Sequence, residues 1–81
     1  MTIDELRSVL YAYIRDEINY SNDFDIEMNI VEQGLVDSMS ILTLVQFLEE
    51  RFGVAIEFED INPDNFRNIN AIAHFMKTLL G

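Results

Sequence analysis

The chain has 81 residues, with 15 acidic against 5 basic side chains and a formal net charge of −10. A charge of this sign disfavours nucleic acids and anionic membrane surfaces as partners and favours basic protein surfaces. Hydrophobic residues make up 49% of the chain and charged residues 25%, which is typical of a single globular domain, here expected to span residues 1–81.

The sequence contains no cysteine, which removes disulfides, thiolate catalysis and cysteine-ligated zinc from consideration. The N-terminus lacks the basic region of a signal peptide, and Asp4, Glu5 and Arg7 interrupt any apolar segment there. The longest fully apolar run is far too short to cross a bilayer. We therefore expect a cytoplasmic protein that does not insert into membranes.

The first predicted element is an amphipathic helix from Ile3 to about Ile18. Thr2 followed by Glu5 is a capping-box pattern, which typically opens a helix. Apolar residues then recur at a spacing of three and four, as on one face of a helix of about four to five turns. We expect this face to pack into the core and not to bind a partner. It comprises Ile3, Leu6, Val9, Leu10, Tyr13, Ile14 and Ile18.

Residues from Asn19 to Asp37 show no helical periodicity and are rich in Asn, Asp and Ser, so they predict a long loop. Loops of this length in a small domain are uncommon and are often functional. Ile26, Ile30 and Leu35 are the apolar residues expected to pin the loop to the core.

The acidic residues of this loop raise calcium binding as an alternative. Asp23, Asp25 and Glu27 alternate as the ligands of an EF-hand loop do. With Asp23 as the first position, however, Met28 occupies the place of the obligatory glycine and Gly34 that of the bidentate glutamate. We therefore expect diffuse screening by cations and no specific metal site.

The loop ends in Gly34-Leu35-Val36-Asp37-Ser38-Met39, where the apolar pattern of a second helix begins. Gly34 permits a turn, and Asp37 is a good N-cap residue. Ser38 then falls in the first helical turn, so we expect its hydroxyl to be exposed beside unpaired amide donors, near the positive end of the helix dipole. An Asp-Ser pair before an apolar run is also an ordinary helix start, and these residues do not by themselves assign a function.

The second helix is predicted from Ser38 to Phe52, and Gly53 would end it. Its apolar residues cover more than a narrow stripe, which indicates either extensive burial or an exposed apolar patch for partners. Met39 and Leu42 could belong to either, because periodicity cannot separate the two. The residues predicted for the core are Leu44, Val45, Leu48 and Phe52.

The remainder of the chain predicts a connector and two more helices. Residues 54–58 alternate like a strand, but a single strand has nothing to pair with, so we expect an extended connector. Asn62 and Pro63 open a short helix whose Phe66 would enter the core. Asn68 caps a last helix from Ile69 to about Leu80. Its inward residues would be Ile69, Ile72, Ala73, Met76 and Leu79 or Leu80, with Lys77 in the last turn, Gly81 after it and His74 on the outer side.

The segment from Gly34 to Met39 resembles the signature of acyl carrier and peptidyl carrier proteins, in which a glycine precedes Asp-Ser-Leu or Asp-Ser-Met. The long loop and the order of the helices are similar to that family too, so the resemblance covers nearly the whole chain. It implies an all-α fold, a small four-helix bundle of three longer helices and one short helix. It also implies a 4′-phosphopantetheine arm, derived from coenzyme A, on Ser38, with Asp37 as motif residue and helix cap.

The resemblance further implies that the protein is a carrier and not an enzyme. An acyl, aminoacyl, polyketide or peptide intermediate would be held as a thioester on the arm and presented to other enzymes. The partners would be a phosphopantetheinyl transferase, a loading ligase, and downstream synthases or transferases with basic docking patches. Their binding face on the second helix is expected at Met39, Leu42, Thr43, Gln46, Glu49 and Glu50.

One departure from the family pattern concerns the acidic residues of the second helix. Carriers of fatty-acid biosynthesis typically spread acids along it, whereas Thr43 and Gln46 are neutral here and only Glu49 and Glu50 remain, next to Arg51. This favours discrete carriers of specialised pathways, such as D-alanyl, aminoacyl or peptidyl carriers. Because the chain begins with Met and ends just past the last helix, we expect a free-standing carrier, with a domain excised from a larger synthase as the alternative. We also expect a monomer.

Two other classes of function compete with the carrier. An enzyme would need Ser38 as a nucleophile with a base, but His74 is the sole histidine, no Gly-x-Ser-x-Gly elbow is present, and so short a chain offers little concave volume. A small acidic helical adaptor without a prosthetic group would explain the acids and the apolar second helix. It would leave the segment around Ser38 as a coincidence.

Overall fold

The computed structural model describes residues 1–18, 25–34 and 36–81. The elements in these ranges are α1 (Ile3–Tyr13), the π-helical segment η1 (Ile14–Ile18), α2 (Ser38–Phe52), the 3₁₀ turn η2 (Phe58–Asp60), α3 (Pro63–Phe66) and α4 (Ile69–Leu80), and none of them is a strand. The predicted bundle of three longer helices and one short helix is therefore confirmed. Within the same ranges, no helix has the length and apolar character needed to cross a membrane.

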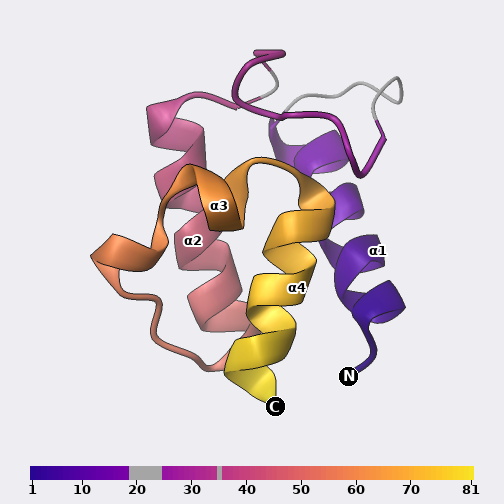
Figure 1. Ribbon diagram of the computed structural model, residues 1–81, viewed down its shortest axis with the longest axis vertical. Coiled ribbons are helices and arrows are strands. Elements are labelled where there is room, and N and C mark those ends of the chain that lie inside the picture. Colours follow the sequence, from indigo (N-terminus) through magenta and orange to yellow (C-terminus); the bar gives the residue numbers. More distant parts are fainter. Residues whose placement is uncertain (19–24, 35) are drawn as a thin grey trace.

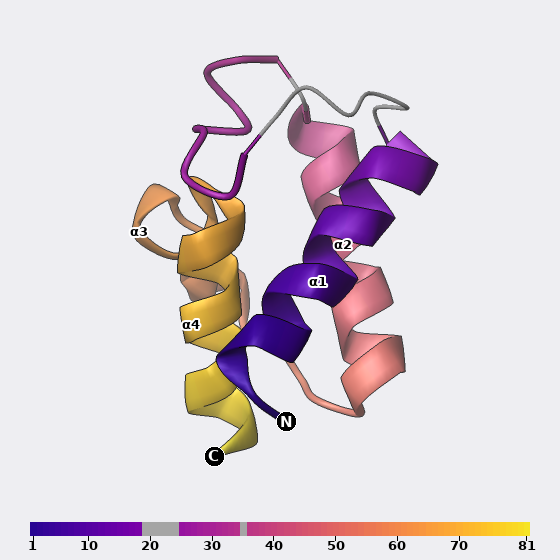
Figure 2. The same cartoon turned by 90° about the vertical axis from the view of Figure 1, so that its right-hand side faces the viewer.

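The helices are arranged so that α2 begins at one end of the bundle and finishes at the other (Figure 1). Both chain termini lie at the end where α2 finishes, and residues 25–34 cross the opposite end, as Figure 2 shows from the side. The Lys77 ammonium donates a hydrogen bond of 2.9 Å to the Met1 carbonyl oxygen, which ties α4 to the N-terminus. Ser38, the first residue of α2, therefore lies at the end of the bundle that the loop covers.

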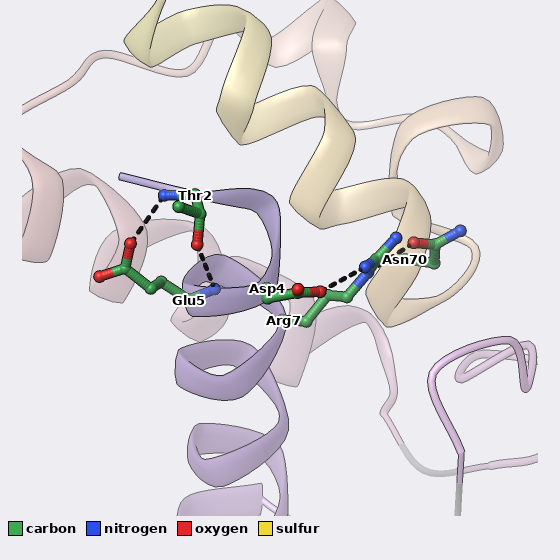
Figure 3. A network of polar contacts seen from close by, with 5 residues as sticks. All are labelled: Thr2, Asp4, Glu5, Arg7 and Asn70. Atoms are coloured by element: carbon green, nitrogen blue, oxygen red, sulfur yellow. Dashed lines mark hydrogen bonds and ion pairs between the residues drawn. The ribbon is translucent and has the colours of Figure 1, made fainter.

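The capping box predicted at the start of α1 is present (Figure 3). The Glu5 carboxylate accepts from the Thr2 amide at 2.9 Å, and the Glu5 amide donates to Thr2 Oγ1 at 3.1 Å. Donation from Thr2 lowers the pKa of Glu5, because it favours the ionised carboxylate. In the next turn Arg7 Nη1 pairs with Asp4 at 2.7 Å, and Arg7 Nε donates to Asn70 Oδ1 at 2.9 Å. Arg7 thereby joins α1 to α4.

The core lies between the three longer helices. The inward face predicted for α1 is confirmed at Leu6, Leu10 and Ile14, which are fully buried, while the side chain of Ile18 is outside the described residues. Helix α1 itself ends at Tyr13 and continues to Ile18 as the π-helical segment η1. Half-buried residues of the predicted α1 face are Ile3, Val9 and Tyr13.

The predictions for α2 and α4 are confirmed at most core positions. Leu44, Val45 and Leu48 of α2 are buried, and so are Ile69, Ile72, Ala73 and Met76 of α4. Phe52 packs against the core but is only half-buried, because it is the last residue of α2 and its outer side meets the Arg51 guanidinium, 6.0 Å from the ring centre. At the end of α4, Leu80 packs against the core and Leu79 is exposed.

The described part of the loop is fastened to the junction of α3 and α4. Ile30 is fully buried and its amide donates to the Arg67 carbonyl at 2.8 Å. The Ile26 carbonyl accepts from the Asn70 amide at 3.0 Å, and Ile26 packs against the core. Ile26 and Ile30 are thus confirmed as the residues that pin the loop. Leu35, the third residue predicted for this role, and Asp23 of the calcium alternative lie outside the described residues.

Asparagine side chains cap the N-termini of α3 and α4, as predicted. Asn62 Oδ1 accepts from the Asn65 amide at 3.0 Å with Pro63 at the first position of α3, and Asn68 Oδ1 accepts from the Ala71 amide at 2.7 Å at the start of α4. Phe66 is buried, also as predicted. Residues 54–57 form the expected connector without strand structure, and His74 is exposed on α4.

Candidate functional site

Ser38 heads α2 and is exposed to solvent. The chain approaches it through a turn at Gly34, whose positive φ of 75° explains the glycine, and through Val36, which is buried with 4% of its surface exposed. The Val36 amide also donates to the Ile30 carbonyl at 3.0 Å. Val36 therefore anchors the segment on the core side, and the residues that follow it are directed outward.

Asp37 is the N-cap of α2, as the sequence predicts. Its backbone is extended, and its Oδ1 accepts a hydrogen bond of 2.9 Å from the Ser40 amide. This bond, reinforced by the Ser40 hydroxyl, lowers the pKa of Asp37. The carboxylate is thus kept ionised and satisfies the helix end, which leaves the neighbouring Ser38 side chain free of a capping role.

The surroundings of Ser38 do not resemble a catalytic centre. No side chain in the described ranges hydrogen-bonds to its hydroxyl, and His74 lies exposed on α4 without a bond to it. Ser38 instead lies at the positive end of the α2 dipole, and the first turn of α2 contains no acidic residue. The dipole would stabilise an anionic substituent on Ser38, and the ionised Asp37 carboxylate beside it would act against that charge.

Five of the six residues predicted to form a partner-binding face are exposed together on α2. Their spacing of three and four residues places them along one side of the helix. Met39 is 72% exposed and Leu42 is 52% exposed, so neither completes the core. The polar members are Thr43, Gln46 and Glu50, all exposed.

Glu49 is placed differently from the other five. Its side chain is half-buried, and its Oε2 accepts a hydrogen bond of 2.9 Å from the Ile56 amide in the connector after α2. The carboxylate is therefore already engaged within the fold. The sequence could not indicate this contact, because it depends on the path of the connector.

A pocket of about 280 Å³, which the sequence did not reveal, opens beside the first turns of α2. Its apolar wall includes Val31 from the loop, Ile41 from α2, Ile61 after η2 and Phe66 from α3. Ile41 lies one turn after Ser38 on the same side of the helix, which places the pocket near the exposed hydroxyl. No pattern within one segment of the sequence indicates this pocket, because its wall comes from the loop, α2 and α3 together.

Comparison with known protein families identifies the family of this chain. The model of the family described as "Phosphopantetheine attachment site" matches residues 8–76, and the chain belongs to this family. It is therefore a carrier protein whose prosthetic group is 4′-phosphopantetheine.

Two individual proteins are similar to this chain over most of its length. The chain is 28% identical over 78 residues to a D-alanyl carrier protein of Leuconostoc citreum (strain KM20), a match that covers 96% of this chain and 95% of that protein. It also matches a chain in the crystal structure of an FAD-dependent dehydrogenase, with a TM-score of 0.76 and 27% identity, over 84% of this chain and 99% of the other.

The residues at the head of α2 fit this prosthetic group. Attachment needs an accessible hydroxyl, an environment that tolerates a phosphodiester, and open space for a long arm. Ser38 is exposed, and it lies at the positive end of a helix of 15 residues. Asp37 caps the helix through Ser40 and would keep doing so whether or not Ser38 is modified.

Proposed function

We propose that Ser38 is the attachment residue and that the protein carries an acyl, aminoacyl, peptide or polyketide intermediate as a thioester. The observation that supports this most directly is the exposed Ser38 hydroxyl, placed directly after the capped helix end and inside the segment that matches the family. A transferase would join the Ser38 oxygen to the pantetheine-side phosphorus of the coenzyme A pyrophosphate, and the bond from that phosphorus to the bridging oxygen would break. The serine loses its proton in this step, and adenosine 3′,5′-bisphosphate leaves.

The protein itself positions the arm and keeps it accessible to other enzymes. The bound arm supplies a thiol, on which a separate ligase would form the thioester. The core side of α2 holds Ser38 at a fixed place through Leu44, Val45 and Leu48, while its outer side stays free for enzymes. Tethering raises the effective concentration of the carried group at each enzyme that docks.

Docking is proposed on the exposed side of α2, with Asp37 and Glu50 as the charged groups and Met39 and Leu42 as apolar contacts. Partners with basic patches would associate quickly with this surface, because opposite charges steer the encounter. A small, partly polar contact also permits the rapid release that a carrier needs. We further propose that residues 1–81 act as one cytoplasmic, monomeric carrier domain.

An aminoacyl group, D-alanine in particular, is the cargo we favour. The D-alanyl carrier protein of Leuconostoc citreum matches nearly the full length of the chain, and the neutral Thr43 and Gln46 on α2 distinguish the helix from the acid-rich helix expected of fatty-acid carriers. Incubation of the modified protein with D-alanine, ATP and a D-alanyl carrier protein ligase should form a thioester that hydroxylamine removes. Failure to load D-alanine, with successful loading of a fatty acyl group instead, would exclude this cargo.

The match to a chain in the crystal structure of an FAD-dependent dehydrogenase favours a second kind of partner. A flavin enzyme could oxidise the carried group by removing two electrons and two protons from adjacent atoms, with the flavin as acceptor. Bleaching of the flavin absorbance on mixing with the loaded carrier, and no bleaching with the unloaded carrier, would support this partner. An unchanged flavin spectrum with every loaded form would count against it.

The attachment is tested by intact-mass analysis after incubation with coenzyme A, magnesium and a broad-specificity phosphopantetheinyl transferase. The parent protein should gain one phosphopantetheine, and Ser38→Ala should gain none. Ser40→Ala is the matched control, because it removes a hydroxyl two residues away and should still be modified. No mass shift in the parent would favour the alternative, a small acidic adaptor without a prosthetic group.

A further inference from the structure

Phe58 is the most exposed of the large apolar side chains that the structure describes. It lies in η2, and 86% of its surface is accessible, against 72% for Met39 at the head of α2. Burial of so exposed a ring at an interface would remove a large apolar surface from water, and phenylalanine is among the residues enriched at the cores of interfaces. No part of the carrier function described above uses this ring.

The turn that presents Phe58 is braced by backbone and side-chain hydrogen bonds. The Phe58 carbonyl accepts from the Ile61 amide at 3.1 Å. Two asparagine side chains add bonds from outside the turn: Asn62 Nδ2 donates to the Glu59 carbonyl at 2.9 Å, and Asn65 Nδ2 donates to the Asp60 carbonyl at 3.0 Å. Because the backbone is already ordered, binding through Phe58 would cost little conformational entropy.

The segment that carries Phe58 is joined on both sides of η2 to α2, the helix that Ser38 heads. Before η2, the Ile56 amide is bonded to the Glu49 carboxylate of α2. After η2, Ile61 shares the wall of the pocket with Ile41 of α2. Phe58 lies between these two contacts in the chain. A protein that binds around Ser38 can therefore reach the ring.

The charges around Phe58 specify the kind of partner. Glu57 and Glu59 flank the ring in the sequence and are exposed, and Asp60 follows. A second copy of this chain would bring the same acids together, and each copy carries a net charge of −10. An occupant with an apolar recess bordered by lysine or arginine matches both the ring and its acidic surroundings.

We propose that Phe58 is an anchor for the phosphopantetheinyl transferase, an inference that rests on the proposed attachment at Ser38. The transferase meets the carrier before any arm exists, so its affinity must come from the protein surface near Ser38. An enzyme that holds the phosphates of coenzyme A also needs basic groups around its active site, which complements Glu57 and Glu59. The ring would fill an apolar recess at the edge of that basic surface.

The test measures binding of the unmodified carrier to a broad-specificity phosphopantetheinyl transferase by calorimetry, without coenzyme A. Phe58→Ala should weaken binding about tenfold, in line with the loss of one buried aromatic contact, and Phe58→Trp should restore most of it. Leu79→Ala, which removes another exposed apolar side chain from α4, is the matched control and should leave binding unchanged.

The outcomes separate this proposal from the attachment itself. With coenzyme A and magnesium added, Phe58→Ala should still become fully modified, with KM raised about tenfold and kcat unchanged. A parent that is modified while Phe58→Ala binds equally well would overturn the anchor and leave the attachment standing, whereas an unmodified parent would overturn both. A parent dimer in light scattering that Phe58→Ala dissolves would assign the ring to self-association and also overturn the proposal.

Discussion

Replacement of Asn68 by alanine is expected to destabilise the fold at the point where the loop meets α4. Asn68 is the one buried polar residue in the described part of the chain, with 7% of its surface exposed. Its Oδ1 caps α4 through the Ala71 amide at 2.7 Å, and its Nδ2 donates to the Glu27 carbonyl at 3.3 Å. One side chain thus satisfies the helix end and holds the loop that leads to Ser38.

The size of the effect follows from the two bonds that Asn68→Ala removes. Loss of an N-cap side chain costs about 1 kcal/mol, and loss of a hydrogen bond of the length seen to Glu27 costs about 0.5–1 kcal/mol. The free energy of unfolding should therefore fall by about 2 kcal/mol. For a domain of this size that corresponds to a decrease in Tm of about 8–16 °C.

Asn68→Ser separates the two contributions. Serine is as good an N-cap as asparagine, but it is too short to reach the Glu27 carbonyl, so about half of the loss should remain. The assay is urea unfolding followed by circular dichroism at equal protein concentration. A loss below about 0.5 kcal/mol for Asn68→Ala, within the range of ordinary surface substitutions, would refute the reasoning. Equal losses for the two variants would show that the contact with Glu27 carries the whole effect.

Four further predictions concern the site and its support. Ile30→Ala removes a fully buried loop residue and should lower the free energy of unfolding by about 3 kcal/mol in urea, whereas Val31→Ala, at an exposed neighbour, should change it by less than about 0.5 kcal/mol. Glu49→Ala should cost about 1 kcal/mol in the same assay because the Ile56 amide loses its acceptor, and Glu49→Gln, which keeps an acceptor, should be close to the parent. Donation from the Ser40 amide lowers the pKa of Asp37 from its usual 3.8. The stabilisation by the ionised Asp37 cap is therefore complete above pH 3.8 and is lost as the pH falls through the lowered pKa. Asp37→Asn, a cap that does not titrate, should flatten the decline of Tm below about pH 4. Raising the salt concentration should increase KM for the transferase without changing kcat, and a KM independent of salt would contradict charge-assisted docking.

The features that sequence could predict are those that depend on neighbouring residues. Helix starts at Thr2, Asp37, Asn62 and Asn68 follow from side chains that reach an amide three residues later, and the structure places the acceptor at each of them. The exposure of Ser38 follows in the same way, because it depends on the cap before it and the apolar run after it. Interactions between residues close in the sequence were therefore sufficient to predict the helices, the Asp37 cap and the exposure of Ser38.

The features that sequence could not predict depend on how distant segments meet. Glu49 looks like any exposed acid of an amphipathic helix until the connector brings the Ile56 amide to it. The pocket near Ser38 is formed by the loop, α2 and α3 together, and no single segment contains its pattern. Phe58 alternates with polar residues as a core residue would, and only the path of the connector leaves its ring outside.

The central claim is that the arm is joined to Ser38, and tandem mass spectrometry of the modified protein tests it directly. After modification with coenzyme A and proteolysis, fragment ions should place the phosphopantetheine on Ser38 and leave Ser40, in the same peptide, unmodified. Fragment ions that place it on Ser40 or on any other residue, or a protein that remains unmodified under conditions that modify a known carrier, would contradict the account.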